Sequence, residues 1–226
     1  MKGDAASFSR WALPGFMLLS SLVLLIIGVP RFLAELALVP GTLIYDRISS
    51  GEFVENAELT VVEESRLQAL EFAELPKAYT DLGTVYLTRA QRATKREDKT
   101  NLARKSIVVT TEGLRLAPLN TFAWSRLSVA HILLGQDHHD KAIEAWRTSV
   151  ASARFEPLLL TQRLHIGIIL YGSMSEQDQS TLRDQFKLTF DWRRGDLRAY
   201  ARQYQLVDWM VLLAGDDVKA IEYLRK

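Results

Sequence analysis

The sequence predicts an all-α protein in which an N-terminal transmembrane helix precedes an irregular α-solenoid of about four helical hairpins. Three observations lead to this fold class. An uncharged apolar run lies near the start, apolar residues recur every three to four positions through most of the rest, and no segment shows the alternation typical of a strand. With 226 residues, the chain has room for one domain of ordinary size beside the apolar run.

Composition excludes several function classes. The chain has no cysteine, which rules out disulfides, thiolate metal sites and a cysteine nucleophile but does not identify the redox compartment. Its 28 Lys and Arg against 27 Asp and Glu give a net charge of +1, so the chain as a whole has no electrostatic preference for nucleic acid or anionic lipid. Any argument from charge must therefore rest on a local cluster.

Residues 11–30 (WALPGFMLLSSLVLLIIGVP) contain no charged side chain. About twenty helical residues span roughly the 30 Å hydrocarbon layer of a bilayer, so this run predicts a transmembrane helix. Pro14 falls in the first turn, where its missing N–H costs little, and Pro30 is expected to help stop the helix. The alternative is a cleaved signal peptide, but the run is long for one and residues 29–32 offer no small-x-small cleavage site. Residues 1–10 are then an N-terminal tail.

Basic residues on the two sides of the run indicate its orientation only weakly. Lys2, Arg10 and the free amino terminus precede the run, and Arg31 and Arg47 follow it. By the positive-inside rule, this slightly favours a cytoplasmic N-terminus. In a cell with two membranes, we then expect a single-pass inner-membrane protein whose globular domain lies in the periplasm.

Residues 31–55 are expected to form an interfacial segment and a connector. The apolar stretch 32–39 is interrupted by Glu35 and is too short to cross a bilayer, so it either lies at the membrane surface or continues the anchor helix. Residues 41–51 contain Gly and Ser without helical periodicity, which predicts a non-helical connector.

The helical domain is expected to begin at Asn56, a residue type that favours helix N-caps. Apolar residues then recur at helical spacing from Leu59 to Ala73, opposite a strongly acidic face. Pro76 breaks the chain before a second helix, which should start near Lys77.

An internal repeat follows in two places. The first unit has Tyr79, Leu82, Gly83 and Tyr86, and the second has Trp124, Leu127, Ser128 and His131. Both resemble the tetratricopeptide repeat signature W-x-x-L-G-x-x-Y, which implies paired helices with large residues between them and a small residue at their closest approach. The two units are 45 residues apart, against a repeat of about 34, and the extra residues are placed in the charged stretch Thr94–Asn101 at the tip of the first hairpin.

The remaining positions of both units fit the same resemblance. The first unit's second helix would use Ser106 and Gly113 as its small residues and would end at Pro118, after which Asn120 caps the helix carrying Trp124. In the second unit, residues 135–140 make the turn, and the next helix carries Ala142, Trp146 and Ser149 before Pro157. Residues 56–157 are therefore expected to be tetratricopeptide-like hairpins.

Residues 158–226 continue the helical pattern without the signature and are expected to cap the stack. One helix over 158–171 stops at Gly172, and Ser173–Glu176 is a capping-box pattern for the next, which should run to about Trp192. Gly-Asp pairs at 195–196 and 215–216 are then expected to end one helix and cap another.

Candidate chemistry is sparse. His138 and His139 lie near His131, but neighbouring residues point in different directions and belong to an expected repeat turn, which favours a solvated turn over a metal site. His131 and His165 are expected to be packing residues. There is no serine nucleophile elbow and no phosphate-binding loop. We therefore predict no enzyme, no cofactor and no small-molecule substrate.

A basic stripe is the candidate partner-binding feature. It consists of Arg89, Arg92, Lys95, Arg96, Lys99, Arg104 and Lys105. Such a stripe is either a solvated hairpin tip or a contact for a protein, an anionic polymer or lipid headgroups. No aromatic residue falls within it, so nucleic acid is not expected. A second basic cluster comprises Arg193, Arg194, Arg198 and Arg202.

These features predict a non-catalytic membrane scaffold or adaptor that binds protein partners through its hairpins, because helical solenoids present long grooves suited to binding. The overall plan is also similar to small envelope proteins associated with exopolysaccharide or O-antigen synthesis. The alternative is a structural accessory subunit of a membrane complex, held mainly through residues 11–30. Gly15, Ser20, Ser21 and Gly28 are small residues suited to helix packing, although they form no clean GxxxG stripe.

Overall fold

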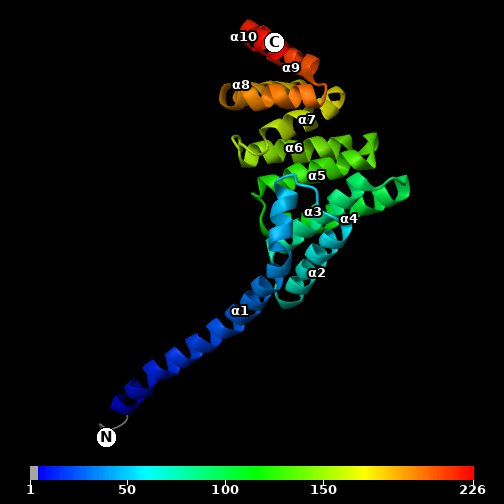
Figure 1. Cartoon of the computed structure of the whole chain (residues 1–226). Helices are drawn as coiled ribbons and strands as arrows, with labels where there is room; N and C mark the ends of the chain where they lie inside the picture. Colours follow the sequence, from blue (N-terminus) through cyan, green and yellow to red (C-terminus); the bar gives the residue numbers. More distant parts are fainter. Residues whose placement is uncertain (1–4) are drawn as a thin grey trace. The chain divides into compact units, whose positions relative to one another are not determined.

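The computed structural model describes residues 5–226, with the side chains of Pro14 and of all residues from Phe16 onward (Figure 1). This part of the chain contains ten α-helices and no strand, so the predicted all-α class is confirmed. The bounds are α1 Ala5–Ser49, α2 Asn56–Phe72, α3 Pro76–Arg92, α4 Arg96–Leu116, α5 Thr121–Leu134, α6 His139–Ser152, α7 Leu160–Leu170, α8 Glu176–Gln203, α9 Val207–Ala214 and α10 Val218–Arg225, with 3-10 turns η1 Gln136–His138 and η2 Tyr171–Ser173.

The chain divides into two compact units, Met1–Ala78 and Tyr79–Lys226. In the first unit, α1 is one uninterrupted helix of 45 residues, and α2 folds back beside its C-terminal part (Figure 1). By length and composition, Phe16–Ser49 is long and apolar enough to cross a membrane, and it overlaps the predicted transmembrane helix over residues 16–30. Residues 1–4 of the predicted tail lie outside the described residues. From Ala5 onward the tail is helical, which corrects that part of the prediction.

The predicted connector over residues 41–51 is wrong, because α1 continues past both Pro30 and Pro40 to Ser49. Gly41 gives the physical reason. It is buried where α2 crosses α1, and a Cβ placed on it would lie 2.6 Å from Ser65 Oγ and 3.0 Å from the Cα of Val62. Gly41 therefore serves the close approach of two helices and not a flexible loop.

The contact between α1 and α2 combines small apolar residues with one buried cation. Ala34 and Leu38 of α1 pack with Ala69 of α2 in one core cluster. The buried Arg66 of α2 donates from Nη1 to the carbonyl oxygen of Leu38 at 2.9 Å, and its guanidinium lies 5.5 Å from the ring centroid of Tyr45. One face of α1 is thus committed to α2.

At the start of α2, the N-cap is Glu55, one residue before the predicted Asn56. The Glu58 carboxylate accepts the Glu55 backbone N–H at 2.8 Å and forms an ion pair with Arg47 Nη1 at 2.6 Å. The bond from the Glu55 backbone and the bond from Arg47 lower the pKa of Glu58. The last turn of α1 is therefore tied to the first turn of α2.

In the second unit, α3 with α4 and α5 with α6 form two successive helix pairs. The turn between α3 and α4 is only residues 93–95, because α4 begins at Arg96, so most of the stretch Thr94–Asn101 is helical and not a tip. Asn120 caps α5 as predicted, with its Oδ1 accepting the N–H of Ala123 at 3.1 Å. The predicted turn 135–140 is shorter than expected, since α6 begins at His139.

The C-terminal helices differ in detail from their predicted boundaries. The capping box of α8 pairs Ser175 with Asp178, and the interruption expected at 195–196 is a kink at Arg193 within α8. Gly215 ends α9 with φ 58°, a conformation that glycine adopts without strain, and Asp217 caps α10 in place of Asp216. A core cluster running from Ala142 of α6 to Leu224 of α10 joins these helices.

Candidate partner-binding site

The first set of repeat-packing residues lies where α3 meets α4. Leu82 and Gly83 are buried, and Tyr79 and Tyr86 are half-buried. Ser106 Oγ of α4 donates to the carbonyl oxygen of Gly83 at 2.7 Å. A methyl group at Gly83 would overlap Thr110 Oγ1, so a larger residue here would require the Thr110 side chain to move.

The second set repeats this contact between α5 and α6. Ser128 Oγ donates to the carbonyl oxygen of Ala142 at 2.7 Å, with both residues fully buried. Leu127 is buried beside them. In each pair, a serine hydroxyl on one helix binds a backbone carbonyl of a small residue on the other, which holds the two backbones close together.

The two tryptophans of the second set have different environments. Trp146 is fully buried, and its Nε1 donates to the carbonyl oxygen of Arg163 in α7 at 3.0 Å. Trp124 is half-buried, and its Nε1 donates to the carbonyl oxygen of Pro118 at 2.7 Å, so it also fastens the turn before α5.

Arg163 is the centre of a buried network that the sequence analysis did not identify. Its guanidinium donates to Thr121 Oγ1 of α5, to the carbonyl oxygen and the Oγ of Ser149 of α6, and to the carbonyl oxygen of Ala153. Burial lowers the pKa of Arg163 to about 10, which still leaves it charged at neutral pH. One cation thereby links three consecutive helices.

The histidines behave as packing residues. His131 is buried and stacks on His138 with ring centroids 5.9 Å apart. Burial first, and then the nearby His138 and Lys141, lower the pKa of His131 to about 4. His139 instead contacts Ser173, through Nδ1 and Oγ at 3.1 Å, and His165 is half-buried with its Nδ1 2.7 Å from the Tyr200 hydroxyl. Within residues 5–226, no group of three or more His, Cys, Asp or Glu side chains is arranged to hold a metal ion.

The basic stripe lies at the end of α3 and in the first half of α4. Arg89 and Arg92 occupy the last turn of α3, where positive charge interacts favourably with the helix dipole. Arg96 and Lys99 occupy the first turns of α4, beside the acidic residues Glu97 and Asp98. The other members are Lys95, which is the N-cap of α4, and Arg104 and Lys105, which are exposed on α4. The structure thus brings all seven to one helix pair.

The second basic cluster is largely occupied with intramolecular contacts. The guanidinium of Arg198 lies 4.4 Å from the ring centroid of Tyr223, and that of Arg194 lies 5.7 Å from it. Arg193 forms an ion pair with Asp196 at 2.6 Å and donates to the carbonyl oxygen of Pro157 at 3.4 Å. These residues fasten α10 and the α6–α7 loop to α8.

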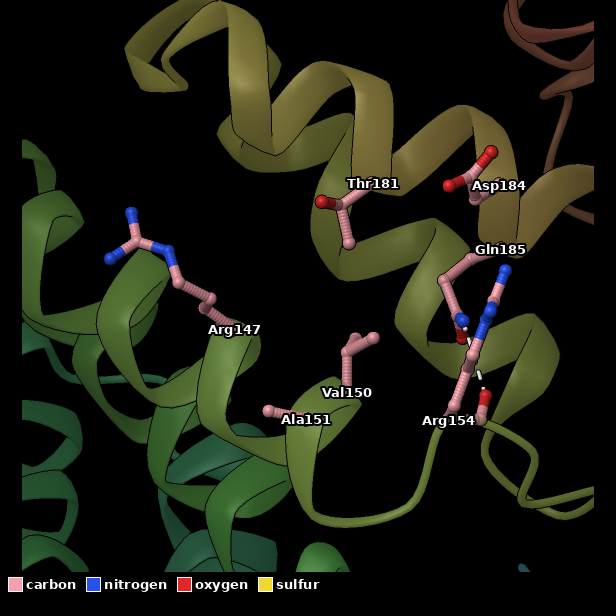
Figure 2. Close-up of a pocket in the computed structure, with 7 residues that line it drawn as sticks. All are labelled: Arg147, Val150, Ala151, Arg154, Thr181, Asp184 and Gln185. Atoms are coloured by element: carbon pink, nitrogen blue, oxygen red, sulfur yellow. Dashed lines mark hydrogen bonds between the residues drawn. The ribbon is translucent and has the colours of Figure 1, made fainter.

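A cavity of about 350 Å³ lies between α6 and α8 (Figure 2). In Figure 2, Arg147 and Arg154 lie at its two ends. The residues that line it are Arg147, Val150, Ala151, Arg154, Thr181, Asp184 and Gln185. At one end Arg147 binds the buried Asp178 through two bonds of 2.9 and 3.0 Å, and at the other the Gln185 Nε2 donates to the carbonyl oxygen of Arg154 at 3.1 Å. In the described part of the chain, the Arg154 guanidinium has no ion-pair partner.

Exposed apolar side chains adjoin the Arg154 end of this cavity. Phe155 and Trp192 contact each other with ring centroids 5.0 Å apart, and Trp192 is 68% exposed. Leu158 of the same loop is also exposed. Trp192 lies two helical turns after Gln185, on the same side of α8. We call the cavity together with Phe155, Leu158 and Trp192 the α6–α8 surface.

Sequence reasoning did not find this surface, although one signal was present. Arg154 and Phe155 lie between the end of an expected helix and Pro157, in a loop, where exposed aromatic and arginine side chains are more informative than in a helix. Comparison with known proteins adds no assignment, since no protein-family model and no curated protein matches the chain.

Proposed function

We propose that this chain is a non-catalytic scaffold anchored in a membrane by α1, whose tetratricopeptide-like helix pairs bind a protein partner in a cell-envelope assembly. The observation that carries the proposal is the repeated contact of the two helix pairs, Ser106 with Gly83 and Ser128 with Ala142. The same small-residue device at corresponding positions supports a repeat architecture, and such architectures present surfaces for binding.

The partner binds at the α6–α8 surface. Tryptophan and arginine are the residue types most enriched among binding hot spots, and exposed aromatic clusters beside a cavity are unusual on a surface without a partner. Phe155 and Trp192 supply the apolar anchor, and the unpaired guanidinium of Arg154 supplies a positive charge. This chemistry selects a segment with an apolar residue next to a carboxylate.

The location follows from α1 and from the charges around it. In this proposal residues 11–30 lie in the inner membrane, and the positive charges of Lys2, Arg10 and the amino terminus favour a helical domain in the periplasm. A role in polysaccharide synthesis or export rests on the similarity of the overall plan alone.

The test is mild cross-linking in intact cells, followed by purification and mass spectrometry of the captured proteins. We compare the native chain with a chain carrying Arg154→Ala and Trp192→Ala, and with a matched control carrying Arg183→Ala and Leu119→Ala, two exposed residues that do not line this surface. The proposal expects the partners to be lost only from the Arg154 and Trp192 variant. Retention of every partner in that variant refutes the α6–α8 surface as the binding site.

Two further variants separate the alternatives. Replacing residues 11–30 by a generic apolar helix of equal length removes partners only if the chain is an accessory subunit held through its anchor. Arg96→Glu with Lys99→Glu removes partners only if the basic stripe is the contact. Full capture in both, together with loss at Arg154 and Trp192, supports the scaffold function.

A further inference from the structure

An exposed apolar stripe runs along α1 with the spacing of a coiled coil. Its members follow one another at alternating intervals of four and three residues, which is the heptad a/d pattern. They are Leu18, Leu22, Leu25, Val29, Phe32, Leu36, Val39 and Leu43. Each exposes between 46% and 78% of its surface.

The opposite side of α1 is already occupied. At 100° per residue, Ala34, Leu38 and Gly41 lie roughly half a turn away from the stripe, and these are the residues that pack against α2. The prolines at 30 and 40 also fall outside the stripe, so neither interrupts it. The stripe is therefore a separate face that nothing within the described part of the first unit covers.

The outer half of the stripe is not explained by lipid. If the anchor ends near residue 30, Leu43 lies roughly 20 Å further along the helix axis, beyond the hydrocarbon layer. Phe32, Leu36, Val39 and Leu43 then expose apolar surface to water, although α1 remains helical throughout. The next position of the pattern is Asp46, where the stripe ends.

We propose that the stripe is covered by the same stripe of a second copy, so that two α1 helices form a parallel homodimer from the membrane to Leu43. The inference rests on the proposed membrane anchoring, because two copies inserted in one bilayer share one orientation and bring identical positions to the same depth. Confinement to the membrane also raises their effective concentration.

The area is sufficient for such a dimer. At roughly 150 Å² for a large apolar side chain, of which about three-fifths is exposed here, the eight residues offer about 700 Å² per copy, close to the ~800 Å² per partner of a standard interface. Within lipid the contact is stabilised by van der Waals packing, and from Phe32 onward by removal of apolar surface from water.

The experiment uses the absence of native cysteine, which makes each introduced thiol unique. Leu36→Cys and Val39→Cys lie on the stripe, whereas Arg31→Cys and Ser49→Cys lie off it at either end. Full-length chains in native membranes are treated with a mild oxidant, and dimers are resolved by non-reducing electrophoresis. Cα atoms must approach to about 4.4–6.8 Å for a disulfide to form, which the two stripe positions satisfy in a parallel coiled coil and the two controls do not.

The proposal expects covalent dimers from both stripe variants and background levels from both controls. It also expects loss of the dimer, measured as particle mass in nanodiscs, when Leu36 and Val39 are both replaced by Glu in the otherwise native chain. Equal cross-linking at all four positions, absence of cross-linking at the stripe, or a mass above that of a dimer overturns it.

Carbonate extraction of the same membranes separates this proposal from the proposed function. If the chain resists extraction but the stripe does not cross-link, the dimer is refuted and the anchor stands. If the chain is released into the supernatant, the anchor is refuted, whatever the cross-linking shows.

Discussion

Replacing Arg163 by Met is the most demanding test of the packing described for the second unit. The side chain is fully buried, and its guanidinium donates to Thr121 Oγ1, to both oxygens of Ser149 and to the carbonyl oxygen of Ala153. Methionine fills much of the same space but donates no hydrogen bond. The substitution therefore leaves the acceptors in place and removes their shared donor.

The expected cost can be worked from these contacts. Removing the donor costs about 1–3 kcal/mol for each buried acceptor that is left without a partner. Thr121 and Ser149 retain two bonds to each other, from Thr121 Oγ1 to the Ser149 carbonyl at 2.7 Å and from Ser149 Oγ to the Thr121 carbonyl at 2.9 Å. With these two bonds kept and the bond to the Ala153 carbonyl oxygen lost, we expect a loss of about 2–3 kcal/mol in the free energy of unfolding.

The assay is urea unfolding of the full-length chain in detergent, followed by far-ultraviolet circular dichroism. Hydrogen exchange with mass spectrometry then localises the change, which we expect in α5, α6 and α7. Arg183→Met, at an exposed position on α8, is the matched control and should change stability by less than about 0.5 kcal/mol. A loss below about 1 kcal/mol at Arg163, or faster exchange spread evenly over the chain, contradicts the reasoning.

Three further predictions test other contacts. Gly41→Ala should destabilise the chain, because the new methyl meets Ser65 and the α2 backbone. Gly195→Ala should instead stabilise α8 by about 0.5–1 kcal/mol, because a Cβ at that position meets nothing within 4 Å. Urea midpoints that move in the same direction for both variants would contradict this. Because the pKa of His131 is lowered to about 4 in the folded chain, the unfolded chain binds a proton at this residue more readily than the folded chain between about pH 6.5 and 4. The free energy of unfolding should therefore fall by about 2 kcal/mol from pH 7 to pH 5. In thermal scans, His131→Phe should reduce that loss. Asp178→Asn should cost about 1–2 kcal/mol, and Arg147→Met should then add almost nothing, since the double-mutant cycle reports their shared ion pair.

Local sequence signals predicted the helices of the second unit well. Asn120 caps α5 as expected, because an Asn before an apolar run satisfies an N–H at the first turn whatever the surrounding fold. Gly83 and Ser128 lie at close helix approaches, since a small residue in an otherwise large-residue pattern is retained where backbones meet. The kink at Arg193 and the N-cap at Asp217 lie within about three residues of the expected positions.

The continuation of α1 was not predictable from local rules. Pro30 and Pro40 each remove a backbone donor, and Gly41 weakens helical propensity, so local reasoning predicts an end near residue 30. The helix persists in the structure, and its outer part packs against α2 through Ala34, Leu38 and Gly41. Residues 56–72 supply that contact, and they lie too far along the chain for the local sequence around residue 40 to indicate it.

The two buried arginines were missed for a different reason. Arginine is mostly exposed in proteins, so Arg66 and Arg163 were not considered as core residues. Both nevertheless lie on apolar faces at helical spacing, Arg66 between Val62 and Ala69 and Arg163 between Leu160 and Gly167. An arginine on the apolar side of a helix is thus a usable signal for a buried network of neutral acceptors.

The helix α1 also shows why an apolar run is an incomplete description of a long helix. Its hydrophobic residues divide at Arg31 into a part that is apolar on all sides and a part with two separate apolar faces. The first has the apolar length that a helix within a hydrocarbon layer needs. In the second, one face contacts α2, and the opposite face, from Phe32 to Leu43, would expose apolar surface to water in an isolated chain. In the proposed dimer, the helix beyond Arg31 therefore has two different neighbours, α2 of its own chain and α1 of a second copy.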